Sequence, residues 1–228
     1  MLPPLLHLQK RPPVRDIGLI SLVAILVVVE FVLIPISPEG PAGHLTGRIL
    51  PAIGLYTGAL LVVPHRRILI VVTILLLAAA SAAGLWPPEK ANLGIEHVSR
   101  FVLLAILTVL ISVSVFSPGE VTMPRVLGAI AIYLLLALLF SSAYSTMIYT
   151  TPRAFHLPAD EPAGALTARM LYFSFTTLTT TGYGDIVPLS PIARSTSNLE
   201  AVIGQIYPAT IIARLITLEL SRRNGNKP

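Results

Sequence analysis

The 228-residue sequence contains no cysteine. Disulfide bonds and thiolate metal sites are therefore excluded, and cysteine usage carries no information about the redox compartment. Charged residues are also scarce, since they form 12% of the chain whereas a soluble domain carries about 25%. Because 54% of the residues are hydrophobic, the composition indicates a protein with several membrane spans.

Other absences narrow the possible functions. The five histidines are scattered without the spacing of metal ligands, so a histidine metal site is not expected. The apolar stretches hold no acid–base or nucleophile constellation, so an enzyme is not expected either. A secondary transporter usually shows internal repeats with paired broken helices, and none is visible. The net charge of +5 lies in short flanks of apolar segments, which argues against nucleic acid as a partner.

The apolar runs are close to the roughly 20 residues that a bilayer crossing requires. We predict an all-α membrane protein with six spans, at residues 17–36, 49–63, 68–86, 101–116, 126–149 and 191–220. Loops are predicted between them, among them residues 37–47, 87–100 and 150–165. Both termini then lie on one side, which carries nine basic residues against six on the other. This bias predicts a multi-pass protein of the plasma membrane with both termini cytoplasmic.

One short stretch is the main candidate for a functional site, namely residues 179–185 with the sequence TTTGYGD. A potassium ion gives up its hydration shell only where a pore supplies oxygens instead. Rings of backbone carbonyls do so when four copies of a short segment meet on one axis. Every carbonyl must then point the same way, which Gly182 and Gly184 allow because glycine enters positive φ at little cost. Tyr183 between them can brace the segment, and Thr180 adds a hydroxyl oxygen.

This stretch resembles the selectivity filter of the potassium channel family, whose usual form is T-V-G-Y-G-D, with Thr181 in place of valine. The flanks agree, since residues 166–178 are predicted as a short re-entrant helix and a long apolar stretch follows the filter. The resemblance covers residues 126–220, closely at the filter and loosely elsewhere. It implies K⁺ sites formed by Thr180, Thr181, Gly182 and Tyr183, an outer mouth closed by Gly184, and Asp185 as its anchor.

Only one filter segment is present, so four chains are needed to close a ring, and we predict a homotetramer. We divide the chain into a four-span membrane domain, residues 1–117, and a pore domain, residues 118–228. The first four spans match six-span channels by layout alone. The fourth span has no lysine or arginine in its interior, so strong voltage gating by that route is not expected. A packing collar and a regulatory domain both remain open for these spans.

Residues around the filter are candidates for supporting it. Glu200 falls within the last span and is predicted to bond the hydroxyl-rich re-entrant helix (Ser174, Thr176, Thr177) or Thr181; the alternative is a protonated glutamate satisfied by a neighbouring helix. Tyr172 and Phe173 stand where family members usually carry paired tryptophans. Glu30 in the first span is expected to be structural, paired to hydroxyl groups of another span.

Residues of the last span are candidates for the gate. Gly204 lies where the family usually has the hinge glycine of its pore-lining helix. With Pro208, Ile212 and Leu215 it recurs at helical spacing, which favours one stripe facing the pore. Pro208 is expected to bend the helix, and the amide of Gln205 to reach the cavity. The alternative is that Gly204 and Pro208 ease helix packing. Arg214 is a candidate for lipid contact.

The resemblance thus implies a channel that passes K⁺ down its gradient without chemistry. Its cofactors would be K⁺ ions in the filter and no organic group. Its partners would be three further copies and membrane lipids, and no nucleic acid. Two alternatives stay open: a weakly selective cation channel, and a non-conducting auxiliary subunit with the same fold.

Overall fold

The structure is a computed structural model, and it describes residues 14–36, 90–116, 123–157 and 166–225. The predicted spans at residues 49–63 and 68–86, and the predicted loop at 37–47, lie outside the described residues. The same holds for parts of the connectors on either side of residues 123–157.

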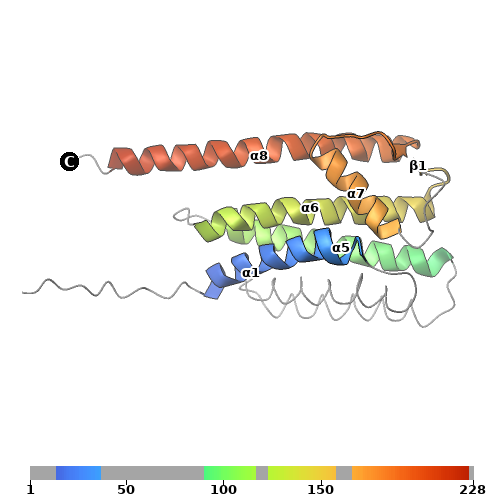
Figure 1. The fold of residues 1–228 in the computed structure, drawn as a ribbon, viewed down its shortest axis with the longest axis horizontal. Coiled ribbons are helices and arrows are strands. Elements are labelled where there is room, and N and C mark those ends of the chain that lie inside the picture. Colours follow the sequence, from blue (N-terminus) through green and yellow to red (C-terminus); the bar gives the residue numbers. More distant parts are fainter. Residues whose placement is uncertain (1–13, 37–89, 117–122, 158–165, 226–228) are drawn as a thin grey trace, which may run out of the picture.

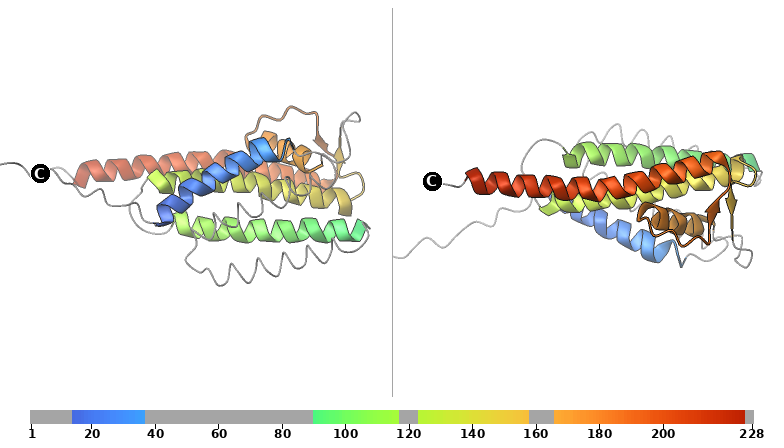
Figure 2. Two further views of the ribbon diagram at one scale, coloured as in Figure 1. Left: turned by 60° about the horizontal axis from the view of Figure 1, so that its bottom comes forward. Right: turned by 90° about the horizontal axis from the view of Figure 1, so that it is seen from above.

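The described part is mostly helical (Figure 1), as the composition predicts. In chain order the elements are α1 (Val14–Val28), a π-helical turn η1 (Val29–Leu33), α5 (Lys90–Phe116), α6 (Met123–Thr150), β1 (Phe155–His156), α7 (Leu166–Leu178), β2 (Val187–Pro188) and α8 (Pro191–Gly225). The long helices α5, α6 and α8 run side by side along the molecule, and the short α7 lies against α6 and α8 (Figure 2).

Helix α5 corrects one boundary of the sequence prediction. Residues 87–100 are predicted as a loop, but the helix already begins at Lys90. The two prolines at positions 87 and 88 cannot continue a helix, whereas the stretch from Ala91 to Arg100 holds no proline. The polar residues of this stretch extend the helix beyond its apolar part, so composition alone misplaces the start.

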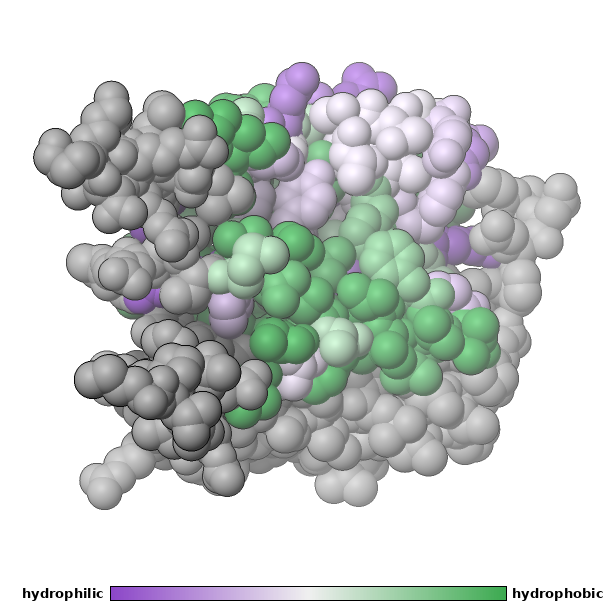
Figure 3. All heavy atoms as spheres, turned by 60° about the vertical axis from the view of Figure 1, so that its left-hand side comes forward, coloured by the Kyte–Doolittle hydropathy of each residue, from purple (hydrophilic) through white to green (hydrophobic). Residues whose placement is uncertain are grey.

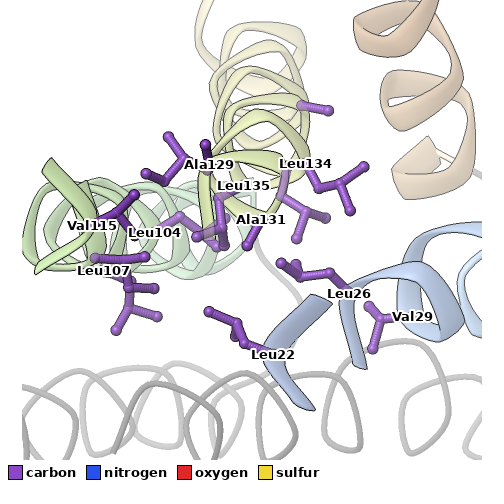
Figure 4. Packing of buried hydrophobic residues seen from close by; sticks show 14 of the residues in the cluster. Leu22, Leu26, Val29, Leu104, Leu107, Val115, Ala129, Ala131, Leu134 and Leu135 are labelled. Carbon is purple, nitrogen blue, oxygen red and sulfur yellow. The ribbon is translucent and has the colours of Figure 1, made fainter. Parts of the chain in front are cut away.

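The core lies where α1 and α5 pack on α6. Leu22 and Leu26 of α1 belong to one buried cluster with Leu104 and Leu107 of α5 and Leu135 of α6 (Figure 4). On its other side α6 contacts α7 and α8. Helix α6 is therefore the central element that joins the N-terminal helices to the filter region.

One helix within the described residues, Met123–Thr150, is long and apolar enough to cross a membrane by length and composition. Shorter apolar helices occur at Ile17–Leu33 and Val98–Val113. An apolar area lies in the middle of the face of the molecule shown in Figure 3. Large apolar side chains such as Val109 and Val113 of α5 are exposed in the protomer, which suits a lipid environment.

Candidate functional site

Helix α7 begins and ends where the sequence predicts, at Leu166 and Leu178. Its C-terminus is closed by two backbone hydrogen bonds, from Thr180 N to Thr177 O at 2.9 Å and from Thr181 N to Thr176 O at 2.8 Å. This pair is the Schellman arrangement, in which the residue after the cap takes the left-handed conformation. That residue is Thr180, with φ at 57°. Gly182 N adds a third bond, to Thr176 O at 3.0 Å, so the predicted filter, residues 179–185, is tied to the last turn of α7.

The sign of φ alternates along the filter. Thr180, Gly182 and Gly184 have φ of 57°, 55° and 82°, whereas φ is not positive at Thr181 and Tyr183 between them. In an ordinary extended strand successive carbonyls point to opposite sides, whereas an alternation of this kind allows them to turn toward one side. The sequence identifies the two glycines for this role. It does not identify Thr180, a β-branched residue for which positive φ is uncommon.

The segment that follows the filter is held by the short strands. Phe155 pairs with Pro188 and His156 with Val187 in an antiparallel ladder. Leu189 N donates to Ala154 O at 2.8 Å, which continues the attachment beyond the strands. The connector before α7 and the segment after the filter are therefore fixed to each other.

Two neighbouring aromatic residues of α7 contact different parts of the protein. Tyr172 stacks on Tyr183 of the filter, with ring centroids 6.2 Å apart and ring planes at 3°. Phe173 points into a buried cluster, where its ring meets Tyr144 and Phe155 edge-on at 5.0 Å and 5.3 Å. Edge-on and stacked rings are favourable geometries, so an aromatic support exists without tryptophan.

Glu200 is fully buried and contacts both neighbouring helices. Its Oε1 lies 2.5 Å from the Ser174 hydroxyl of α7, and its Oε2 accepts from the Tyr144 hydroxyl of α6 at 2.5 Å. Of the predicted partners only Ser174 makes this contact. Tyr144 is not among the partners predicted from the sequence. A tyrosine inside a span nevertheless indicates a polar partner, because its hydroxyl group must be satisfied when buried.

The threonines proposed as partners of Glu200 bond elsewhere. The Thr176 hydroxyl donates to Phe173 O of its own helix at 2.9 Å. The Thr181 and Thr179 hydroxyl groups lie 2.9 Å apart on the exposed side of the filter. Thr177 acts through its carbonyl, which accepts from Thr180 N. Asp185 is exposed in the protomer.

Gly204 corrects the predicted pore-facing stripe. It is buried, and a Cβ added to it would lie 1.8 Å from Leu178 O, so this glycine lets α8 approach the end of α7. Pro208 and Ile212 are exposed but line a groove of about 210 Å³ between α8 and α6. Gly204 therefore faces α7 of the same protomer. The pore-facing role of the exposed Pro208 and Ile212 stays a prediction. Gln205 is exposed beside it.

Helix α8 continues through Pro208. Two tyrosine hydrogen bonds join α6 to its neighbours, one to α7 and one to α8. Tyr133 donates to Leu178 O at 3.2 Å, and Tyr207 donates to Ala129 O at 2.8 Å. Their rings stack with centroids 5.8 Å apart. These contacts, also missed from the sequence, join α6, α7 and α8 below the filter.

Two charged candidates lie away from the filter. The Arg214 guanidinium of α8 lies over the Phe116 ring of α5, 5.1 Å from its centroid, in a cation–π contact. Glu30 is buried in η1, and neither of its carboxylate oxygens has a hydrogen-bond partner among the described residues. Its predicted pairing with hydroxyl groups is therefore wrong within that part of the chain.

A comparison with protein families gives one match. A family model described as an ion channel matches residues 132–219, from within α6 through the filter to α8. No curated protein matches the chain. The match supports an ion channel family for the second part of the chain, and with the apolar helix α6 it supports a membrane protein.

Proposed function

We propose that the protein is a potassium-selective channel that conducts K⁺ passively across the membrane. The observation that carries the proposal is the alternating sign of φ at Thr180, Gly182 and Gly184, in a segment tied to the end of α7. Four such segments around one axis would offer successive rings of carbonyl oxygens to a dehydrated ion. The ion channel match over the same residues supports it.

The filter residues take the following roles in this proposal. K⁺ is bound by the carbonyls of Thr180, Thr181, Gly182 and Tyr183 together with the Thr180 hydroxyl, while Gly184 closes the outer mouth and Asp185 anchors it. Tyr172, Thr176, Thr177 and Glu200 support the filter. Gln205, Pro208 and Ile212 contribute to the pore and its gate. Conduction of this kind needs no catalytic group and no organic cofactor.

The proposed assembly is a homotetramer with six spans per chain and both termini in the cytoplasm. The filter of one protomer is exposed along residues 179–185, as a surface completed by further copies requires. Helix α8 also exposes apolar side chains, among them Leu199, Val202 and Ile206. In a membrane such side chains meet lipid or another copy at little cost, so this part of α8 is suited to contact a further copy.

The test is the reversal potential of the purified protein in liposomes, with K⁺ on one side and Na⁺ on the other. A potential near that of K⁺, with block by barium, is the expected result. A clear current that reverses near zero would instead establish the weakly selective cation channel. Protein that assembles but never conducts would favour the auxiliary subunit.

Gly182→Ala is the matched variant for this measurement. A Cβ at Gly182 meets no atom of the protomer within 4 Å, so the substitution tests the positive φ rather than the space. We expect folded protein without selective K⁺ current. Normal selectivity in this variant would contradict the proposed filter.

A further inference from the structure

The buried contacts of Glu200 need more protons than the two hydroxyl groups can supply. Three oxygen–oxygen contacts form a chain: Tyr144 to Glu200 at 2.5 Å, Glu200 to Ser174 at 2.5 Å, and Ser174 to Ala137 O at 2.9 Å. Each requires one proton between its two oxygens. Tyr144 and Ser174 each carry one hydroxyl proton, and the carbonyl of Ala137 carries none. The Ser197 hydroxyl next to Tyr144 donates to Ala193 O at 2.9 Å, so it supplies no proton to this chain. One proton is missing if Glu200 is ionised.

A protonated Glu200 completes the chain. Its hydroxyl donates to Ser174, which then donates to Ala137 O, while Tyr144 donates to the other carboxyl oxygen. Tyr144, Ser174 and Glu200 are all buried, so water does not satisfy a missing link. Among the described residues no cationic side chain forms an ion pair with Glu200, and a buried unpaired charge is costly.

The chain joins three helices at the point where the filter is attached. Glu200 of α8 meets Ser174 of α7, and one turn later Gly204 of α8 meets Leu178 of α7. Tyr144 and Ala137 belong to α6. Ser174 lies two residues before Thr176, whose carbonyl accepts from the filter amides of Thr181 and Gly182. A displacement of α8 at Glu200 would therefore move the turn that holds the filter.

We propose that Glu200 works as a neutral carboxylic acid whose proton completes a hydrogen-bond chain from Tyr144 through Ser174 to Ala137, and that this chain fixes α7 and the filter to α6 and α8. Tyr144 and Ser174 are positioning residues in this arrangement, acting on the filter through α7. The inference rests on the proposed channel function for its effect on selectivity. The proton on Glu200 does not depend on conduction.

The first experiment reads the proton directly. An infrared difference spectrum between the natural protein and Glu200→Gln, both in liposomes, should contain the carbonyl band of a protonated carboxylic acid, shifted in D₂O. Because Glu30 is a second buried carboxyl group, the same difference is recorded in a Glu30→Gln background, where the band should persist. A carboxylate signal in place of this band would overturn the proposal.

The second experiment uses the K⁺ over Na⁺ permeability ratio to distinguish a neutral from an ionised Glu200. The amide of Glu200→Gln can donate to Ser174 and accept from Tyr144, so it should keep the K⁺ over Na⁺ permeability ratio. Glu200→Ala breaks both contacts and should lower that ratio roughly ten-fold, the effect of losing about one to two hydrogen bonds. Ser174→Ala should act in the same direction. Ser145→Ala is the matched control, because Ser145 is also buried but bonds only Ser141 O of its own helix.

The outcomes are distinct. Equal damage by the glutamine and alanine variants, or an unchanged ratio in Glu200→Ala, would contradict the positioning role. If the natural protein carries no current, the channel function fails, while the infrared band still decides whether Glu200 holds the proton.

Discussion

A single missing methyl group at Gly204 decides how closely α8 approaches α7. The added Cβ would lie 1.8 Å from Leu178 O and 2.7 Å from its carbonyl carbon, both backbone atoms. Backbone at the end of α7 cannot move without shifting the filter attached to it. Gly204 therefore allows close packing of α8 on α7. The spacing of residues in the sequence could not distinguish this packing role from a hinge.

Gly204→Ala should destabilise the protein by about 1–3 kcal/mol, the usual cost of overpacking a core. Thermal unfolding in detergent measures it. Gly128→Ala is the comparison: its Cβ would also be crowded, 2.6 Å from a Val115 methyl and 2.9 Å from a Leu19 methyl, but these are side-chain atoms rather than backbone. The packing argument fails if Gly204→Ala is as stable as Gly128→Ala.

Glu30 presents the opposite situation to Glu200, since its buried carboxyl group has no hydrogen-bond partner in the described part of the chain. Leaving such a group unsatisfied costs about 1–3 kcal/mol, so Glu30→Leu should raise the unfolding temperature in detergent. Glu30→Gln should not, because it keeps two buried polar atoms. A lower unfolding temperature in the leucine variant would instead show that Glu30 is satisfied in the assembled protein.

At the scale of elements, the filter depends on the way α7 ends. Thr180 occupies the left-handed position of the Schellman motif, which glycine usually fills. A branched side chain is strained there, and such strain is characteristic of functional positions. In the proposed channel the hydroxyl group that Thr180 supplies to the innermost ion site explains why the strain is kept.

Thr180→Gly should therefore raise the stability of the protein while it lowers the selectivity for K⁺. Relief of the left-handed strain, which costs roughly 1–2 kcal/mol for a residue with a Cβ, should raise the unfolding temperature. Loss of the hydroxyl oxygen should lower the K⁺ over Na⁺ permeability ratio in liposomes. Thr180→Ser, which keeps the hydroxyl, serves as the control and should retain the ratio. A glycine variant with reduced stability would refute the strain argument.

The elements near the filter could be predicted because their signals are local. Residues 166–178 contain no proline or glycine, and the glycines at 182 and 184 mark where positive φ is needed. The bond between Tyr144 and Glu200 joins residues 56 positions apart, and no local pattern specifies it. The sequence places Glu200 at the right depth and names Ser174 among its partners, but the choice of partner depends on how α6, α7 and α8 pack.

At the scale of the whole molecule, the proposed tetramer requires that part of α8 line a common water-filled cavity. Gln205 and Val113 are both exposed in the protomer, but they lie on different helices, α8 and α5. Only the face of α8 directed to the shared axis would contact water, whereas α5 would contact lipid. The chain contains no cysteine, so a single introduced cysteine reports on its own position.

A charged thiol reagent should therefore reduce the K⁺ current of Gln205→Cys and leave that of Val113→Cys unchanged. The reagent cannot react quickly in hydrocarbon because it is charged and thiolates form poorly there. The rate of current loss in liposomes measures the difference, and the untreated variants provide the reference currents. Equal modification of both cysteines would contradict this arrangement, and so would a conducting protein that is not modified at Gln205→Cys. A water-filled cavity between four α8 helices exposes position 205 to the reagent and leaves position 113 in lipid, so either result would show that this face of α8 does not line the pore.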